Sequence, residues 1–531
     1  MKTTNNMKKL FAIILGAGML TSVGCKKSLL DVENPGAYSY ETYFTDAPQI
    51  NEAVIATYAV FLHNGMWSRE YYFIMDLMGN DAKRDAPLQG DIRPLSDFTF
   101  TPANSILTNL WSGLYRMVLR SNVVIDRANA WNPTTDANKA LKKQYIAEAK
   151  FMRGYANMQL VTLWGRVPLR SSYIESITNL YPKRNSVEEL WAAVEADLKD
   201  AVTDLPLPKD QASSDLGRAN KGSAIALLGR AYLYQKKYQD ANTTLLALTK
   251  APYTYSLSTK FDDLFSQTNQ NNPEIVFQVM HATWTDWGIG NQYYVFGGQE
   301  TWGGKATHSD RAQEYGFNDW RNVFVSDALV QAYKYKNEKN EDYIDPRAKS
   351  TFYGDAASGG KTDYCNHCAE GTIPFPFTES EGGYRWRKYQ YYEDVKSYGG
   401  PQSGINSLVI RYADVLLMIA ETYIQQNDPN SAQPYINDVR KRAGAFEYTT
   451  LGGKDNAMQL LMRERRLELA GEQSRYFDLL RWGLLKTVLN AELKDQYEAE
   501  TFQDKNVLLP IPQQEKDTNP NVSGDVANSW N

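Results

Sequence analysis

The sequence predicts a mainly α-helical fold in which helix pairs flank a loop-rich, irregular insert that carries short β-strands. Apolar residues recur at three- and four-residue spacing, one motif occurs on both sides of the insert, and the composition changes between the two copies. Ser186 followed by Glu189 has the pattern of a capping box and marks one helix start. The predicted helices cover residues 48–62, 104–129, 138–164, 186–204, 220–235, 238–249, 408–426, 431–442 and 456–471.

The repeated motif has the spacing of a tetratricopeptide unit. Gly229 is followed by Tyr232 three positions later and by Ala241 nine positions after that, and residues 420–432 repeat these offsets. Small residues let the two helices of a hairpin approach closely, while the tyrosine fills the neighbouring groove. We therefore predict that Tyr232 and its counterpart Tyr423 belong to the core and not to a ligand site.

The stretch from residue 252 to residue 400 is rich in Gly, Asn, Tyr and Pro, with β-like pieces at 275–280 and 385–392. The domain prediction divides one globular unit and its leader into consecutive regions. These are a leader (1–24), an acylated cysteine with a linker (25–45), an N-terminal helical region (46–250), a loop-rich ligand-binding region (251–400) and a C-terminal helical region (401–531).

The N-terminus has the order of a bacterial lipoprotein signal. Basic residues precede an apolar run from Leu10 to Leu20, and small residues then lead to Cys25. The run is shorter than the roughly 20 residues that span a bilayer, so we predict cleavage before Cys25 and acylation of its thiol. A soluble exported protein with a leftover thiol is the alternative.

The other two cysteines, Cys365 and Cys368, lie close together in the sequence, and an oxidising exterior favours a disulfide bond between them. With His367 they also supply metal-ligand types. Three ligands within four residues strain a tetrahedral site, however, and no second ligand pair completes it. We expect neither a metal ion nor a cofactor.

Charge and motifs argue against two function classes. The chain has 57 Lys+Arg and 62 Asp+Glu, and the basic residues are interleaved with acidic ones, which argues against nucleic-acid binding. Its four His form no HExxH motif, no GxSxG motif occurs, and residues 354–362 miss the phosphate-loop spacing by one position. An acidic pair for glycoside hydrolysis stays open, because its separation depends on the fold. The alternating charges of residues 463–468 indicate a salt-bridged scaffold or a partner-facing surface.

Aromatic side chains outside the helix faces are the candidate ligand-binding residues. A sugar ring offers an apolar C–H face and a rim of hydroxyls, so flat rings beside amides and carboxylates match it. The alternative is that the rings pack an irregular loop as its own small core. The candidates are Trp284, Trp287, Asn291, Tyr293, Tyr294 and Trp302, then Trp67, Tyr71, Tyr72 and Asp76, and finally Trp320.

An ordered set of motifs resembles SusD/RagB lipoproteins over nearly the whole chain after the leader. In the N-terminal half these are Leu30-Asp31 with Pro35, TYF at 42–44, AEAKFMR at 147–153, WGRVPL at 164–169 and GRANKG at 217–222. In the C-terminal half they are NPEIVF at 272–277, RYADVLLM at 411–418, INDVRKRAG at 436–444, RYFDLLRWG at 475–483 and LPIP at 509–512. Each motif alone is weak evidence, but the ordered set is highly specific.

The resemblance implies a lipid-anchored outer-membrane protein facing the cell exterior, built from tetratricopeptide helix pairs. Such a protein binds glycans for polysaccharide utilisation and delivers oligosaccharides to a SusC-like TonB-dependent importer. The resemblance implies no enzymatic activity, and it implies ligand contacts from the N-terminal loops and the mid-chain loops together. The alternatives are a peptide- or other-nutrient-binding lid of the same importer type, or a surface scaffold without an uptake role.

Overall fold

Helices form most of the secondary structure in this computed structural model, so the mainly α-helical prediction is confirmed. The structure describes residues 40–84, 90–173, 180–281, 311–317, 320–365, 371–378, 383–390, 403–497 and 502–523. Residues up to Thr45 form one unit, which contains the short helix α2 (Tyr40–Tyr43), and residues from Asp46 onward form a second unit. The rest of this description concerns the second unit.

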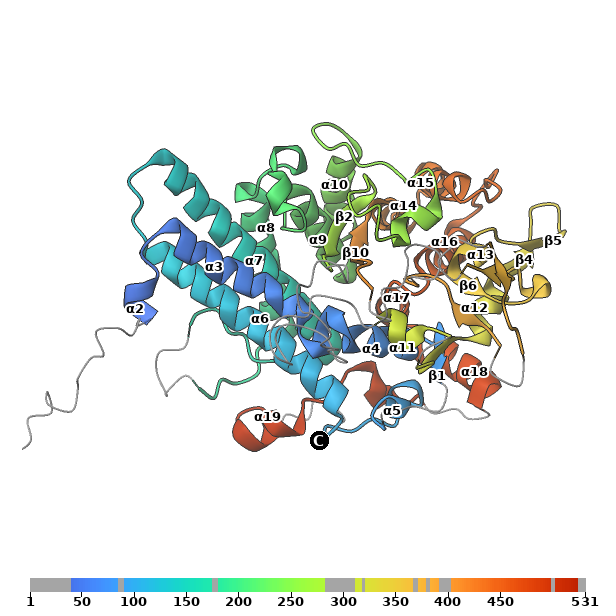
Figure 1. Cartoon of the computed structure of the whole chain (residues 1–531), viewed down its shortest axis with the longest axis horizontal. Helices are drawn as coiled ribbons and strands as arrows, with labels where there is room; N and C mark the ends of the chain where they lie inside the picture. Colours follow the sequence, from blue (N-terminus) through green and yellow to red (C-terminus); the bar gives the residue numbers. More distant parts are fainter. Residues whose placement is uncertain are drawn as a thin grey trace, which may run out of the picture. The chain divides into compact units, whose positions relative to one another are not determined.

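Its N-terminal part is an array of helices with defined starts (Figure 1). The second-longest helix begins after Asn104, because the Asn104 side chain accepts hydrogen bonds from the backbone N–H groups of Ile106 and Leu107 at 3.1 and 3.2 Å. The predicted capping box of Ser186 and Glu189 is also present. The helices are α3 (Ala47–Tyr58), α4 (Glu70–Met78), α5 (Arg93–Ser96), α6 (Ser105–Ala130), α7 (Asp136–Trp164), α8 (Val187–Asp204), α9 (Lys221–Tyr234) and α10 (Tyr238–Leu246).

The C-terminal part continues the same array. Helix α10 packs against the first C-terminal helix, although more than 160 residues separate them, and Asn242 Nδ2 donates to Thr422 Oγ1 across this contact at 2.8 Å. The two sequence halves therefore share one helical stack. The C-terminal helices are α14 (Tyr412–Gln425), α15 (Pro429–Arg442), α16 (Lys454–Leu469), α17 (Arg475–Trp482), α18 (Leu485–Tyr497) and α19 (Gln513–Thr518).

The tetratricopeptide spacing acts as predicted at Gly229. A Cβ atom on Gly229 would lie 2.4 Å from the side chain of Leu245, so a larger residue here would force Leu245 to shift, and glycine allows the close approach of α9 to α10. Tyr232 is buried, as predicted, while Tyr423 is half-buried and stacks on Tyr435 with ring centroids 5.9 Å apart. Both tyrosines pack between helices.

A pair of antiparallel strands connects the helical array to the insert. Strand β2 (Ile275–Val279) pairs with β10 (Ser407–Arg411). The chain between these two strands therefore leaves the helical array and returns to it at the same place. The prediction of a helix over 408–426 is wrong at its start. Residues 407–411 are extended because their backbone pairs with β2, and the helix begins at Tyr412.

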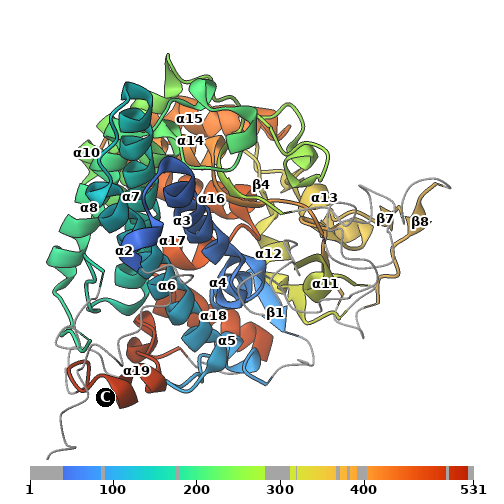
Figure 2. The ribbon, with the colours of Figure 1, turned by 60° about the vertical axis from the view of Figure 1, so that its left-hand side comes forward.

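The insert consists of short elements, as predicted, and Figure 2 shows them apart from α7, α8 and α10. Strand β1 (Ala82–Arg84), from the N-terminal part, joins the insert by pairing with β3 (Val323–Val325). The other pairs are β4 (Lys334–Lys336) with β5 (Asp342–Ile344), β6 (Phe352–Tyr353) with β9 (Arg385–Trp386), and β7 (Asp363–Tyr364) with β8 (Ile373–Pro374). The helices are α11 (Arg311–Tyr315), α12 (Asp327–Ala332) and α13 (Ala348–Thr351).

Candidate ligand-binding site

A polar surface groove lies in the insert, where two adjoining hollows of about 350 and 490 Å³ share Asp262 and Arg387. Both volumes lie within the range of small-molecule sites. The amide hollow is lined by Asp262, Asp263, Phe265, Ser266, Thr268, Ser350, Tyr353, Arg387, Lys388 and Gln390. The basic hollow is lined by Asp262, Lys349, Ala356, Gly359, Gly360, Lys361, Thr362, Asp363 and Arg387.

An ion pair marks the boundary of the two hollows. Arg387 Nη2 lies 2.9 Å from Asp262 Oδ2. Burial would raise the pKa of Asp262, but hydrogen bonds from Arg387 and Ser350 outweigh it, so its pKa lies below the ordinary value. Asp262 therefore stays ionised and presents acceptor oxygens to the groove at neutral pH.

Gln390 is the polar side chain best suited to a ligand in the amide hollow. It is 6% exposed, and in the described part of the chain neither its Oε1 nor its Nε2 has a hydrogen-bond partner. A primary amide combines two donor hydrogens with an acceptor oxygen, which matches neighbouring hydroxyl groups. An unpaired buried polar group costs about 1–3 kcal/mol, so a partner that bonds to both atoms would stabilise this side chain.

The backbone just before Gln390 is fixed in an unusual conformation. Tyr389 has φ of +62°, a region that bulky residues rarely adopt, and such strain is common at functional sites. The guanidinium of Arg311 lies 4.1 Å from the centroid of its ring. This turn sends Lys388 inward and leaves Gln390 on the groove wall.

A buried charge network lies beneath the groove. Lys388 Nζ contacts the Glu472 carboxylate at 3.0 Å and the backbone oxygens of Glu468 and Ala470 at 3.1 and 3.0 Å. Burial lowers the pKa of Lys388 to about 8 although Glu472 favours its charged form. The network comprises Arg347, Lys388, Arg411, Arg440 and Arg442 with Glu274, Asp345, Glu464, Glu468 and Glu472, and no side chain in it is more than 4% exposed.

This network explains the alternating charges of residues 463–468. Glu464 and Glu468 point into the interior, where they pair with arginines from α15 and from the insert. Arg465 pairs with Asp478 at 2.8 Å. The salt-bridged scaffold is therefore present, inside the protein, and it joins the insert to the C-terminal helices.

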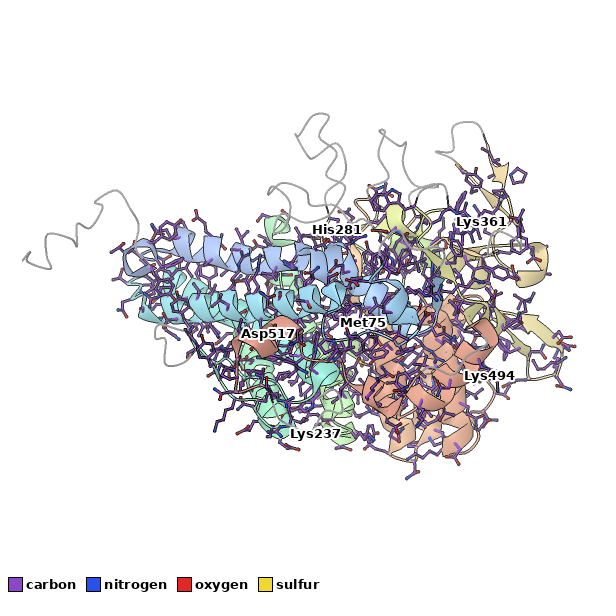
Figure 3. All side chains as sticks on the ribbon, turned by 90° about the horizontal axis from the view of Figure 1, so that it is seen from below. Met75, Lys237, His281, Lys361, Lys494 and Asp517 are labelled. Carbon is purple, nitrogen blue, oxygen red and sulfur yellow. The ribbon has the colours of Figure 1, made fainter. Side chains whose placement is uncertain are left out.

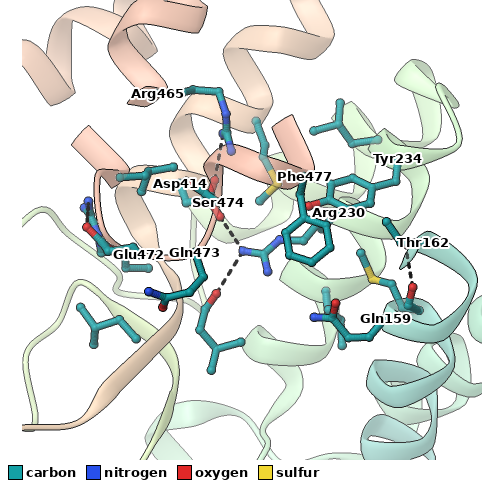
Figure 4. A pocket seen from close by; sticks show the side chains of 18 of the residues that line it. Gln159, Thr162, Arg230, Tyr234, Asp414, Arg465, Glu472, Gln473, Ser474 and Phe477 are labelled. Atoms are coloured by element: carbon teal, nitrogen blue, oxygen red, sulfur yellow. Dashed lines mark hydrogen bonds and ion pairs between the residues drawn. The ribbon is translucent and has the colours of Figure 1, made fainter. Parts of the chain in front are cut away.

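A smaller interior cavity of about 50 Å³ lies among α7, α9, α14 and α17 (Figure 4). Arg230 and Arg465 bind the two carboxylate oxygens of Asp414 at 2.5 and 2.9 Å. Burial would raise the pKa of Asp414, but these arginines lower it to about 2. The volume suits a few water molecules and not a sugar ring, so this cavity is not the ligand site.

A third hollow, of about 420 Å³, lies on the helical side of the molecule between α6 and α19. Trp111 and Tyr115 line it with ring centroids 4.7 Å apart, and Gln514 lies on its far wall. The hydroxyl of Tyr115 already donates to the Pro168 carbonyl oxygen at 2.8 Å. In the described residues, no buried side-chain polar atom that lines this hollow lacks a partner, in contrast to the amide hollow.

The predicted N-terminal site residues lie in the interior. Trp67, Tyr71, Tyr72 and Asp76 are at most 3% exposed. Trp67 Nε1 donates to a tyrosine hydroxyl at 2.9 Å, and Asp76 accepts from Tyr315 at 2.9 Å. These residues face inward because η3 (Asn64–Ser68) and α4 are surrounded by other elements. Trp67 and Tyr71 line the small interior cavity, and direct ligand contact stays a prediction.

The other predicted residues have different outcomes. Trp320 is half-buried, and its contact with a ligand stays a prediction. Trp284, Trp287, Asn291, Tyr293, Tyr294 and Trp302 lie outside the described residues, as does Cys25. Cys365 is buried and forms a disulfide bond, whereas its predicted partner Cys368 lies outside the described residues.

Within the described ranges, no helix combines the length and the apolar character needed to cross a bilayer. The same ranges hold no group of three or more His, Cys, Asp or Glu side chains arranged to bind a metal ion.

Sequence reasoning missed the groove residues. Lys361 lies in residues 354–362, whose spacing misses that of a phosphate loop, and Figure 3 shows it among the side chains of the insert. Asp262, Arg387 and Gln390 are brought together by the fold from positions up to 128 residues apart, and nothing in the local sequence marks them. The run of Gly and Lys at 359–361 was the one visible signal.

Helix pairs around a loop-rich insert with a polar groove define a class of binding protein, and two family models identify it. One, described as the SusD family, matches residues 273–526, and another, described as starch-binding associating with outer membrane, matches residues 41–233. The chain belongs to the SusD/RagB family.

Known relatives cover nearly the whole chain. SusD-like protein P25 of Formosa agariphila is 24% identical over 96% of this chain and 97% of its own length. The crystal structure of a SusD superfamily protein from Bacteroides vulgatus is 25% identical, with a TM-score of 0.76 over 91% of this chain and 99% of that chain. A laminarin-binding SusD-like protein is 24% identical, with a TM-score of 0.71 over 90% of this chain and 98% of that chain, and it shows the shared fold.

Proposed function

We propose that this protein is a cell-surface glycan-binding lipoprotein that captures oligosaccharides in the groove at Asp262 and Arg387 for import. The observation that carries the proposal is Gln390, a buried amide facing the amide hollow with both polar atoms unpaired in the described residues. Beside it the hydroxyls of Ser266 and Thr268 offer further donors and acceptors. The laminarin-binding relative of the same fold supports a sugar as the ligand.

The proposal includes the membrane anchor and the transport partner. Acylation of Cys25 would hold the protein on the outer membrane, facing the exterior, and a SusC-like TonB-dependent importer would receive the oligosaccharide. Confinement of both proteins to one membrane raises their effective concentration, so a moderate intrinsic affinity would suffice. Copurification of a barrel transporter after gentle detergent extraction tests this partner, and recovery of the monomer alone across several detergents counts against it.

Stacking by the aromatic segment stays part of the proposal. Trp284, Trp287 and Trp302 would supply ring faces that the amide hollow lacks, because Phe265 and Tyr353 in its wall are buried. Arg311 is the first described residue after that segment, and it packs on Tyr389, the residue before Gln390.

The test is a binding screen of the soluble protein, lacking residues 1–25, against a polysaccharide panel and a peptide pool. We expect at least one polysaccharide to bind, and Gln390→Ala to weaken that binding by about 1–3 kcal/mol, the contribution of two hydrogen bonds. Since the variant also removes a buried unpaired amide, its melting temperature should stay the same or rise.

Gln514→Ala, in the wall of the third hollow, is the matched control and should leave affinity unchanged. Equal losses in the two variants would contradict the location of the site. Binding of the peptide pool alone would replace glycan with the peptide alternative.

A further inference from the structure

We infer that Arg311 is a positioning residue for glycan binding, because it holds the ring of Tyr389 and thereby places the amide of Gln390 on the groove wall. This inference rests on the proposed function and concerns the same groove. Arg311 is not among the described residues that line the two hollows, so it acts on a ligand through its neighbours.

The helical array fixes Arg311. This side chain is 3% exposed, and its Nη2 donates to Asp76 Oδ2 on α4 at 3.1 Å and to the backbone oxygen of Gly471, which follows α16. Asp76 in turn accepts from the Tyr315 hydroxyl at 2.9 Å and from Gln473 Nε2 at 3.1 Å. Each of these hydrogen bonds is costly to break, because it would leave a buried polar atom unpaired. The position of the guanidinium is therefore set by groups that line neither hollow of the groove.

The same guanidinium covers the ring of Tyr389. Its Cζ lies 4.1 Å from the ring centroid, which is within the range of a cation–π interaction, and this attraction is stronger where water is excluded. Phe265, in the wall of the amide hollow, packs edge-to-face against the Tyr389 ring with centroids 5.1 Å apart. The ring of Tyr389 therefore joins Arg311 to the groove wall.

The backbone of Tyr389 transmits these ring contacts to Gln390. A tyrosine with φ of +62° is strained, and such a conformation persists only where surrounding contacts hold it. When the guanidinium is removed, relaxation toward negative φ rotates the peptide that leads into Gln390. The backbone N–H of Gln390, which donates to the Arg387 carbonyl oxygen at 3.1 Å, then loses part of this hydrogen bond. A displaced Gln390 amide no longer meets a ligand with both of its polar atoms.

The main variant combines Asp76→Asn with Arg311→Met, so that neither partner of the ion pair is left charged and buried. The matched control, Glu148→Gln with Arg218→Met, removes an ion pair of 2.8 Å whose carboxylate is fully buried and whose guanidinium lies 5.9 Å from a tyrosine ring. Neither control residue lines the groove.

Calorimetry measures the affinity of the soluble protein for oligosaccharides of laminarin, starch, xyloglucan, xylan and pectin. We expect the main variant to bind about fivefold more weakly than wild type, no more than Gln390→Ala, because displacement forfeits at most the hydrogen bonds of that amide. The control should bind like wild type.

Combination with Gln390→Ala distinguishes positioning from a general structural role. If Arg311 acts through Gln390, the main variant causes no further loss of affinity once residue 390 is alanine, whereas independent effects add. Hydrogen exchange supplies a readout without ligand. Peptides that contain Gln390 should exchange faster in the main variant than in the control, while those from helix α15 exchange alike in both.

Tyr389→Leu tests the same contact with the ion pair intact, so the test does not depend on the folding of the main variant. This change removes the ring beneath the guanidinium and should reproduce the loss of affinity. Tyr389→Phe keeps the ring and should bind like wild type.

An additive loss in the Gln390→Ala background, unchanged exchange at Gln390, or wild-type affinity in either the main variant or Tyr389→Leu overturns this inference and leaves the proposed function intact. Equal losses of affinity in the main variant and the control do the same. Failure of every oligosaccharide to bind the wild-type protein overturns both.

Discussion

Glu468→Gln tests whether the buried charge network stabilises the join between the insert and the C-terminal helices. Glu468 is fully buried, and its Oε1 accepts from Arg411 at 2.6 Å and its Oε2 from Arg347 at 2.9 Å, while Arg442 also pairs with Oε1. Glutamine keeps the shape and removes the charge. Three buried guanidinium groups then lose their common partner.

The expected loss of stability follows from the charges that stay buried in the variant. Removing one partner from a buried ion pair costs about 3–5 kcal/mol, because the other charge stays buried. Unfolding entropy is about 2.1 cal/mol/K per residue, so a cooperative unit spanning residues 46–531 changes in stability by roughly 1 kcal/mol per kelvin near its midpoint. We therefore expect the melting temperature of the variant to fall by about 3–5 °C.

Differential scanning calorimetry measures this shift, and Glu447→Gln, the same change at an exposed position, should leave the midpoint almost unchanged. A pH series gives a second readout. Burial would raise the pKa of Glu468, but Arg442, Arg411 and Arg347 lower it well below its usual value. The stabilisation is therefore complete above about pH 4.5 and is lost as the pH falls further, so the difference between wild type and variant should shrink there. A midpoint within 1 °C of the Glu447→Gln control at neutral pH would refute the reasoning.

Two further predictions concern Lys388 and Cys25. Because the pKa of Lys388 is about 8 when folded and 10.5 when unfolded, the unfolded chain binds more protons between these values, and the unfolding free energy should rise with pH there. Urea denaturation at pH 7.5 and 9.5 should show a larger increase for wild type than for Lys388→Met, and equal increases would contradict this assignment. Cys25→Ala should release the protein from the membrane fraction, and unchanged metabolic lipid labelling in that variant would disprove the anchor.

Helices could be predicted from the sequence because their signals are local. Apolar periodicity and the capping box at Ser186 act within a few residues, and the helices lie where these signals place them. The error at residues 408–411 has a nonlocal cause. The apolar residues of β10 suit a helix face and a buried strand equally, and pairing with β2, which begins 132 residues earlier at Ile275, decides between them.

The charge network and the groove could not be predicted from the sequence, because they too depend on contacts between distant segments. Alternating charges at 463–468 look alike on a solvated helix face and in a buried network, and the difference lies in Glu274, Arg347 and Arg411, which come from three other segments. Gln390 carries no local signal of function, since its lack of partners depends on residues that the fold brings around it.

The network and the groove meet in three consecutive residues. Lys388 is bound inside the protein, Tyr389 adopts a strained turn beneath Arg311, and Gln390 faces the amide hollow. A binding amide needs a fixed position to gain affinity from its hydrogen bonds, and fixing it requires partners that do not themselves contact the ligand. The buried lysine meets this need, since its three acceptors come from residues 468–472 at the end of α16 and the loop that follows it. Lys388 therefore anchors the backbone beside the groove to the helical array.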